Sequence, residues 1–196
     1  MIEVIDNALP EPLFKSILNI IDGGNNFHGS NTFTWYLTND IYNPKKYPKG
    51  ISTLQLSHIL YYDVDDDSYS GEQLNSPHAQ FIHKLIIPIL EKKNINGTIV
   101  KSKFNLLFPH PKINNELKYN VPHRDLEFPH YSVLLYMNDS DGDTVFFKDI
   151  GVDELQRIKP KLNRMVISDG VYHTSTNPIK SSYRIVLNMV LRKDNE

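Results

Sequence analysis

Two stretches in the first half of the chain have apolar residues at the spacing of a helix. After Pro10 and Glu11, apolar residues recur every three or four positions until Gly23 and Gly24, which are typical helix stop signals. Residues 77–93 repeat the pattern with a second stripe of apolar side chains. Both stretches therefore predict helices that bury one face.

The other regular pattern is that of short β-strands separated by turn-forming residues, and it dominates the chain from residue 98 onward. The predicted strands are 2–5, 55–62, 98–108, 131–137, 144–147, 164–168 and 183–191. Short strands in close succession are typical of an antiparallel sandwich or barrel. We therefore predict a mainly β chain with flanking helices (α+β), in which two N-terminal helices pack on a C-terminal β-sandwich.

Two segments lack such periodicity. Residues 25–54 are rich in Asn, Gly, Pro and Lys, which indicates a long surface segment, and residues 109–122 interrupt the strands. A chain of 196 residues is long enough for one domain with a real core, so we expect residues 1–196 to form a single domain. Within it, residues 1–97 would form a helical preface with flanking strands, and residues 98–192 the β core.

Composition and charge narrow the classes of function. Hydrophobic residues make up 40% of the chain and charged residues 22%, both ordinary for a globular protein. The formal net charge of −2 gives no electrostatic footprint for nucleic acid or for an anionic membrane. The N-terminus has no basic stretch followed by an apolar run, and no run approaches the roughly 20 apolar residues of a membrane helix. We therefore expect a cytoplasmic protein.

The candidate metal ligands are His123 and Asp125, separated by Arg124, with His173 far downstream. Because the chain has no cysteine, a metal must be bound here by imidazole, carboxylate or neutral oxygen atoms. Residues i and i+2 of an extended segment point to the same side, and Pro122 favours an extended conformation just before the motif. Two imidazoles and one carboxylate suit Fe(II) and leave coordination positions open. Taken singly, each residue also fits a surface loop or, for His173, a core histidine.

Five segments that include these residues follow one another in a distinctive order. They are YNVPHRD (119–125), YSVLLYMN (131–138), GDTVFF (142–147), PKLNRMVISDGVYH (160–173) and YRIVLN (183–188). In this order they resemble the 2-oxoglutarate/Fe(II)-dependent oxygenase superfamily, and within it the prolyl-4-hydroxylase-like branch. The second segment looks like a core strand that ends in Tyr-Leu-Asn, and the fourth is similar to a Pro-Lys-x-Gly segment with a distal histidine. The resemblance implies a double-stranded β-helix, the jelly-roll type of fold that cupins share.

The resemblance also implies an activity. Such an enzyme uses Fe(II), 2-oxoglutarate and dioxygen, with ascorbate as an additive in vitro, and couples oxidative decarboxylation of 2-oxoglutarate to hydroxylation of a substrate. It implies that His123, Asp125 and His173 bind the metal and are the catalytic residues. The substrate stays open between a small molecule and a peptide, with a peptidyl-prolyl or other amino-acid side chain suggested by analogy alone. The sequence gives no indication of the oligomeric state.

Two further residues are candidates for binding the co-substrate. Arg184 lies eleven positions after His173, where the family has its basic residue, and its guanidinium presents a planar fork to a carboxylate. A buried cation is costly without a partner, so we expect it to bind the distal carboxylate of 2-oxoglutarate, unless it is a surface arginine on an edge strand. Tyr136 would donate a second hydrogen bond, unless it is a core tyrosine. The chain departs from the family at Val186, where some branches have Ser, and at Phe108, where a tyrosine is expected.

Four residues are candidates for lining the substrate pocket: Trp35, Tyr36, Arg124 and His130. Core packing of the two aromatic residues fits equally, and for His130 a plain loop position is favoured. A rival interpretation of the whole chain is a non-enzymatic, metal-binding cupin-like module, or a structural protein whose His and Asp residues hold Zn(II) or no metal. The two interpretations differ at Arg184, because a binding module has no need for an inward-facing cation.

Overall fold

The computed structural model describes residues 1–22, 33–38, 53–63, 73–74, 76–110, 119–149 and 153–194 of the chain. The helices are α1 (Glu11–Ile21) and α2 (Ala79–Glu91). The strands are β1 (Ile2–Ile5), β2 (Tyr36–Thr38), β3 (Gln55–Tyr62), β4 (Gln73–Leu74), β5 (Thr98–Leu107), β6 (His130–Tyr136), β7 (Thr144–Phe147), β8 (Glu154–Ile158), β9 (Met165–Ser168), β10 (His173–Ser175) and β11 (Arg184–Arg192). Two predicted helices and a β-rich second half are thus confirmed, while most of segments 25–54 and 109–122 lies outside the described residues.

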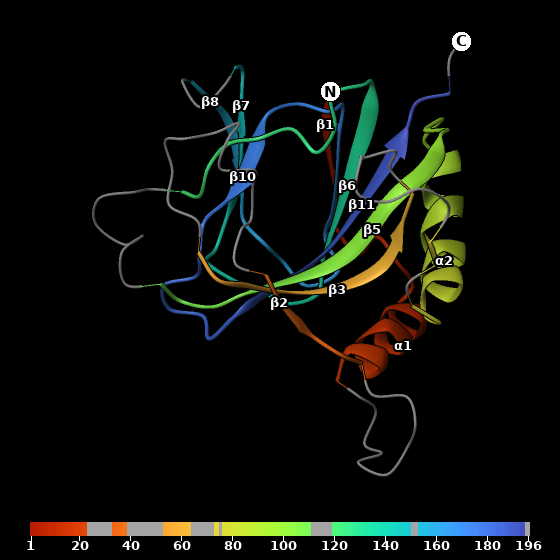
Figure 1. The fold of residues 1–196 in the computed structure, drawn as a ribbon, viewed down its shortest axis with the longest axis horizontal. Coiled ribbons are helices and arrows are strands. Elements are labelled where there is room, and N and C mark those ends of the chain that lie inside the picture. The colour runs from red at the N-terminus through yellow and green to blue at the C-terminus, as the bar shows by residue number, and fades with distance from the viewer. Residues whose placement is uncertain are drawn as a thin grey trace.

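The strands form two antiparallel sheets within these ranges. The larger sheet has the strand order β1-β9-β6-β11-β5-β3-β2, with β4 paired to β3, and the smaller sheet has the order β10-β7-β8. Figure 1 shows the two helices on one side of the larger sheet and the smaller sheet on the other. A large antiparallel sheet that faces a small one agrees with the predicted jelly-roll type of fold.

Strand β6 divides its side chains between the two faces of the larger sheet. Val133 and Leu135 belong to a hydrophobic cluster that includes the buried residues of both helices. Leu134 and Tyr136 belong to a second cluster, which includes Phe146 of the smaller sheet. One face of the larger sheet is therefore directed at the helices, and the other, here called the inner face, is directed at the smaller sheet.

Four strands of the structure are not indicated by the sequence pattern. β2, β4 and β10 have only two or three residues each, which is too short for an alternation to be recognised. β8 has four exposed residues before one buried residue, so it lacks the apolar alternation of a strand with one buried face. Tertiary pairing, and not local pattern, makes these segments strands.

Asn163 fixes the segment before α1 to the turn before β9. Its φ of 59° lies in the left-handed region, which asparagine and glycine adopt more readily than other residues. The side-chain oxygen accepts the N–H of Leu9 at 3.0 Å, and the side-chain nitrogen donates to the carbonyl of Leu9 at 2.8 Å. The backbone N–H of Ala8 adds a third bond, to the Asn163 carbonyl at 2.9 Å.

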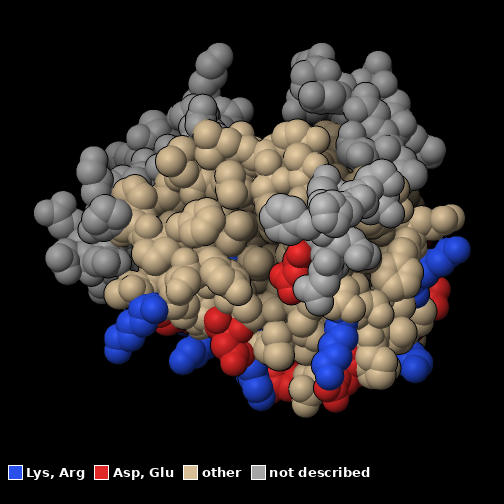
Figure 2. Space-filling model, turned by 90° about the horizontal axis from the view of Figure 1, so that it is seen from below, with Lys and Arg blue, Asp and Glu red and all other residues tan. Residues whose placement is uncertain are grey.

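The charged surface mixes both signs. On the face shown in Figure 2, blue and red side chains alternate along one edge, and no continuous patch of one sign is visible among the coloured residues. This agrees with the small formal net charge of −2. None of the helices in the described ranges is long and apolar enough to span a membrane.

We predict that Asn163→Ala lowers the free energy of unfolding by about 3 kcal/mol, because it removes two buried hydrogen bonds and leaves an alanine in the left-handed region. Asn163→Gly should cost about 2 kcal/mol, since glycine tolerates this φ and only the hydrogen bonds are lost. Urea unfolding of the three proteins measures both values. A glycine variant no more stable than the alanine variant would show that the backbone conformation contributes nothing.

Candidate functional site

The structure brings together the three residues that the sequence indicates as metal ligands. His123, Asp125 and His173 each offer one ligand atom, and these atoms lie within 4.8 Å of one another. His123 and His173 form an antiparallel bridge in which each backbone N–H donates to the other's carbonyl at 2.9 Å. Nε2 of His173 lies 3.5 Å from Oδ2 of Asp125. Two segments fifty residues apart in the chain are thus held side by side at the cluster.

The two histidine rings are oriented in the same way by the backbone. Nδ1 of His123 contacts the carbonyl of Val121 at 3.0 Å, and Nδ1 of His173 contacts the carbonyl of Val171 at 3.1 Å. Because a carbonyl can only accept, each Nδ1 carries the hydrogen and donates it. Each Nε2 then keeps its lone pair, which is the arrangement of a metal-ligating histidine whose other nitrogen is held by a backbone carbonyl.

The protonation states also suit a cation. Burial lowers the pKa of His123 to about 4, and the nearby His173 adds to this effect, while Asp125 opposes it. Burial alone would raise the pKa of Asp125, but the charges of Lys101 and the two histidines, together with a hydrogen bond from Ser132, hold it well below its usual range. A neutral imidazole and an ionised carboxylate are the forms that bind metal.

Three side chains position the carboxylate of Asp125. The hydroxyl of Ser132 donates to Oδ2 at 2.8 Å, and Nδ2 of Asn188 donates to Oδ1 at 3.3 Å. Nζ of Lys101 lies 3.4 Å from Oδ1. These roles were not predicted from the sequence, although strand alternation places Asn188 on the same face as Arg184.

Arg184 and Tyr136 converge on a residue that was not predicted, Thr144. Nη2 of Arg184 donates to Oγ1 of Thr144 at 2.9 Å, and the Tyr136 hydroxyl donates to the same oxygen at 2.7 Å. The guanidinium carbon lies 5.5 Å from the centroid of the Tyr136 ring. Since Thr144 accepts twice through Oγ1, its own hydroxyl hydrogen remains available to donate. The three side chains form a buried group of donors.

This group has no acidic partner in the described part of the chain. Arg184 is only 3% exposed, and its Nε is buried without a hydrogen-bond partner. Burial lowers the pKa of Arg184, and Asp143 opposes this through its charge without a hydrogen bond. A Cβ on Gly142 would lie 3.1 Å from Cδ of Arg184 and 2.8 Å from the carbonyl oxygen of Thr176, so glycine makes room for the arginine. A buried guanidinium of this kind calls for a carboxylate ligand.

Asp141 holds the turn that leads into Arg184. Its carboxylate accepts three backbone N–H groups, from Ile179 at 3.1 Å, Lys180 at 2.7 Å and Ser181 at 3.1 Å. Burial alone would raise the pKa of Asp141, but these donors outweigh it and lower the pKa to about 2. The same carboxylate therefore fixes the start of β11.

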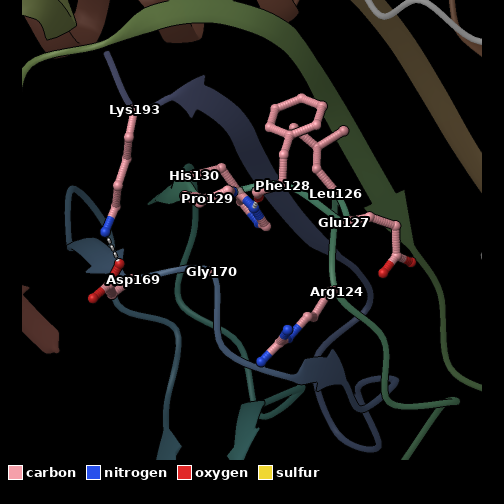
Figure 3. Close-up of a pocket in the computed structure, with 9 residues that line it drawn as sticks. All are labelled: Arg124, Leu126, Glu127, Phe128, Pro129, His130, Asp169, Gly170 and Lys193. Atoms are coloured by element: carbon pink, nitrogen blue, oxygen red, sulfur yellow. Dashed lines mark hydrogen bonds and ion pairs between the residues drawn. The ribbon is translucent and has the colours of Figure 1, made fainter. Parts of the chain in front are cut away.

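Arg124 and His130 line a cavity of about 190 Å³. Its other lining residues are Leu126, Glu127, Phe128, Pro129, Asp169, Gly170 and Lys193. Figure 3 shows the His130 ring in the middle of these residues and Lys193 directed at Asp169 on one side. Nδ1 of His130 donates to the Phe128 carbonyl at 2.7 Å, and its Nε2 is buried without a hydrogen-bond partner among the described residues. The cavity thus offers one unused acceptor and an exposed guanidinium.

The other two candidates for substrate binding lie elsewhere. Trp35 packs edge-on against Phe33, with ring centroids 5.1 Å apart, and contacts the hydrophobic cluster beneath the helices. Tyr36 is 61% exposed on the edge strand β2. The structure therefore brings Arg124 and His130 together in one cavity, but neither Trp35 nor Tyr36 lines it.

Comparison with solved structures gives the fold a family context. An oxidoreductase of the 2OG-Fe(II) oxygenase family from Burkholderia pseudomallei matches with a TM-score of 0.71 and 11% identity, covering 99% of this chain and 86% of that one. A prolyl-4-hydroxylase from Pseudomonas putida matches with a TM-score of 0.54 and 14% identity, covering 99% and 93%. HygX from Streptomyces hygroscopicus, solved with nickel and 2-oxoglutarate bound, matches with a TM-score of 0.55 and 10% identity, covering 96% and 81%.

No family model and no curated protein matches the chain by sequence. At 10–14% identity, the structural matches show a shared fold over nearly the whole chain. The chain therefore has the fold of 2-oxoglutarate/Fe(II) oxygenases, as the five sequence segments predicted.

We predict that Asp141→Asn lowers the free energy of unfolding by about 1 kcal/mol at pH 7, because a neutral amide oxygen accepts the three N–H groups less strongly than a carboxylate does. The folded-state pKa of about 2 lies below the ordinary 3.8, so this stabilisation is complete above pH 4 and is lost as the pH falls toward 2. Urea unfolding at pH 7, 5 and 3 measures the difference, with the exposed Asp153→Asn as control. A difference that stays constant down to pH 3 would contradict the assignment.

Proposed function

We propose that this protein is an Fe(II)- and 2-oxoglutarate-dependent dioxygenase that hydroxylates an amino-acid side chain, in a peptide or a free amino acid. The observation that carries the proposal is a pair of features on one inner face. A His–Asp–His cluster offers three candidate ligand atoms within 4.8 Å of one another, and a buried arginine lacks an acidic partner in the described residues. A bound cation would be coordinated by the cluster, and a dicarboxylate would pair with the arginine. The likeness in fold to 2-oxoglutarate/Fe(II) oxygenases supports the same conclusion.

His123, Asp125 and His173 would hold the iron. Their donor set of two imidazoles and one carboxylate suits Fe(II) and leaves open positions, and both ring orientations expose Nε2. Ser132 and Asn188 would keep the Asp125 carboxylate in place, as outer partners of a metal ligand do. The fit therefore extends beyond the three ligands to the groups that orient them.

Arg184, Thr144 and Tyr136 would hold the distal carboxylate of 2-oxoglutarate. Arg184 would supply charge and a planar fork, and Thr144 its unused hydroxyl hydrogen. When bound, iron, 2-oxoglutarate and dioxygen supply oxidative decarboxylation coupled to hydroxylation, while the protein supplies position and electrostatics. The alternative function, a metal-binding module without activity, does not explain why Arg184 is buried at a cost in stability.

The substrate side would include the cavity of Arg124 and His130, where the unused Nε2 of His130 could accept a hydrogen bond from the substrate. Among the structural neighbours, a prolyl hydroxylase from Trichoplax adhaerens was solved with a peptide fragment, which supports a peptide as one class of substrate. We further propose that residues 1–196 form one oxygenase domain, with the N-terminal helices packed on the β core.

We predict that anaerobic titration of the Fe(II)-loaded protein with 2-oxoglutarate produces the weak visible charge-transfer band of the chelate. Arg184→Met should raise the Kd of 2-oxoglutarate roughly 100-fold and leave iron binding unchanged, because it removes the partner of one carboxylate. His173→Ala should abolish the band together with iron binding. Arg192→Met, at the exposed end of the same strand, is the matched control and should behave as wild type.

Two results would count against the proposal. If iron binds and no band appears in the wild type, the chain is a metal-binding sandwich without this activity. If Arg184→Met reduces iron and 2-oxoglutarate binding equally, Arg184 supports the fold of the site and does not hold the co-substrate.

A further inference from the structure

A second group of cations lines the inner face beside the metal cluster. The register of β5 with β11 pairs Lys101 with Val190, Lys103 with Asn188, and Asn105 with Val186. Paired residues of neighbouring antiparallel strands share a face. Asn188 and Lys101 both contact Asp125, so this is the face that carries the metal cluster. Lys103 therefore lies on the inner face, at the level of Asn188.

The polar neighbours of Lys103 already have partners. Lys101 pairs with Asp125, and Asn105 accepts hydrogen bonds from Gln55 at 2.8 Å and from Ser57 at 3.2 Å. Lys103, in contrast, makes no hydrogen bond or ion pair within the described ranges, and its side chain is only partly exposed. Burial lowers its pKa to about 7, Lys101 adds to this, and Asp125 opposes it. Among the residues that the structure describes, the amine thus has no anionic partner.

The charge on the inner face points to the same need. Among the described residues, Arg184, Lys101 and Lys103 share this face with the carboxylate of Asp125, while the nearby Asp143 is paired with Arg157. On the proposed function, Fe(II) and 2-oxoglutarate carry equal and opposite charges, so binding both leaves the excess of positive charge unchanged. A further anion would reduce this excess.

That anion cannot be the distal carboxylate held by Arg184. Lys103 is opposite Asn188, four positions further along β11 than Arg184. At about 3.3 Å per residue, this places the two levels roughly 13 Å apart along the strand. Lys103 instead lies level with Asn188, which donates to the candidate metal ligand Asp125, and a substrate has to lie close to that metal to react.

We propose that Lys103, with Lys101 beside it, binds an anionic group of the substrate, a carboxylate or a phosphate, and so selects acidic substrates. This inference rests on the proposed function for the identity of the site as an oxygenase centre. The subsite itself consists of two amines on β5: that of Lys103, which has no partner in the described part of the chain, and that of Lys101, which also contacts Asp125. Lys103 is the specificity residue to test, because Lys101 contacts a metal ligand and its replacement would disturb the metal as well.

The test uses inorganic phosphate and acetate as probes, titrated calorimetrically into the anaerobic Fe(II) protein saturated with 2-oxoglutarate. We predict that Lys103→Met weakens phosphate binding at least tenfold, the expected loss of one charge-assisted contact. The matched control is Lys92→Met, which removes an exposed lysine at the end of α2. The affinity for 2-oxoglutarate should be the same in all three proteins. Stronger binding of phosphate than acetate would assign a phosphorylated substrate, and equal binding a carboxylate.

Three outcomes would overturn the inference. The wild type fails to bind either probe, or all three proteins bind phosphate equally, as they would if it bound at the iron. Alternatively, Lys103→Met weakens 2-oxoglutarate itself tenfold, which would make Lys103 a co-substrate residue. Failure of 2-oxoglutarate to bind the wild type would instead contradict the proposed function, and the phosphate comparison can then be repeated on the metal-free protein. Far-UV circular dichroism and thermal unfolding confirm that each variant is folded.

Discussion

The two backbone hydrogen bonds between His123 and His173 are the contact on which the site depends. They join the segment that leads into β6 of the larger sheet to the first residue of β10 in the smaller one. With the backbone fixed there, each ring needs only one further bond, from Nδ1 to a carbonyl two residues earlier, to direct Nε2 inward. The geometry of the cluster therefore follows from main-chain pairing and not from side-chain packing alone.

Around this cluster, the inner face of the larger sheet carries buried charges that lower the stability of the fold. A buried guanidinium and a partly buried amine, neither with an acidic partner in the described residues, both oppose folding. On the opposite face of the larger sheet, apolar residues of the sheet and the helices form one buried cluster, and their burial offsets this cost. One face of the larger sheet thus stabilises the fold, while the other carries the groups that would bind ligands.

The sequence predicts the candidate site residues best where local strand pattern and side-chain chemistry point to the same position. The spacing of His123 and Asp125 predicted that both ligands lie on one side, and the structure brings them together with His173. The segment similar to Pro-Lys-x-Gly has Asn163 at the glycine position, and a positive φ explains why either residue fits. Thr144 was missed because its role depends on β7 lying across from β6 and β11, which no local pattern reveals.

The two cation sites, at Arg184 and at Lys103, differ in burial, and this difference affects the order in which co-substrate and substrate can bind. Arg184 is 3% exposed and enclosed by Thr144 and Tyr136, while Lys103 is partly exposed. On the proposed function, a co-substrate that must reach the deeper site has to enter before a larger substrate covers the shallower one. Once 2-oxoglutarate has neutralised Arg184, the remaining positive charge lies beside the metal cluster. Its attraction for an anion then acts only where a substrate group must lie to react.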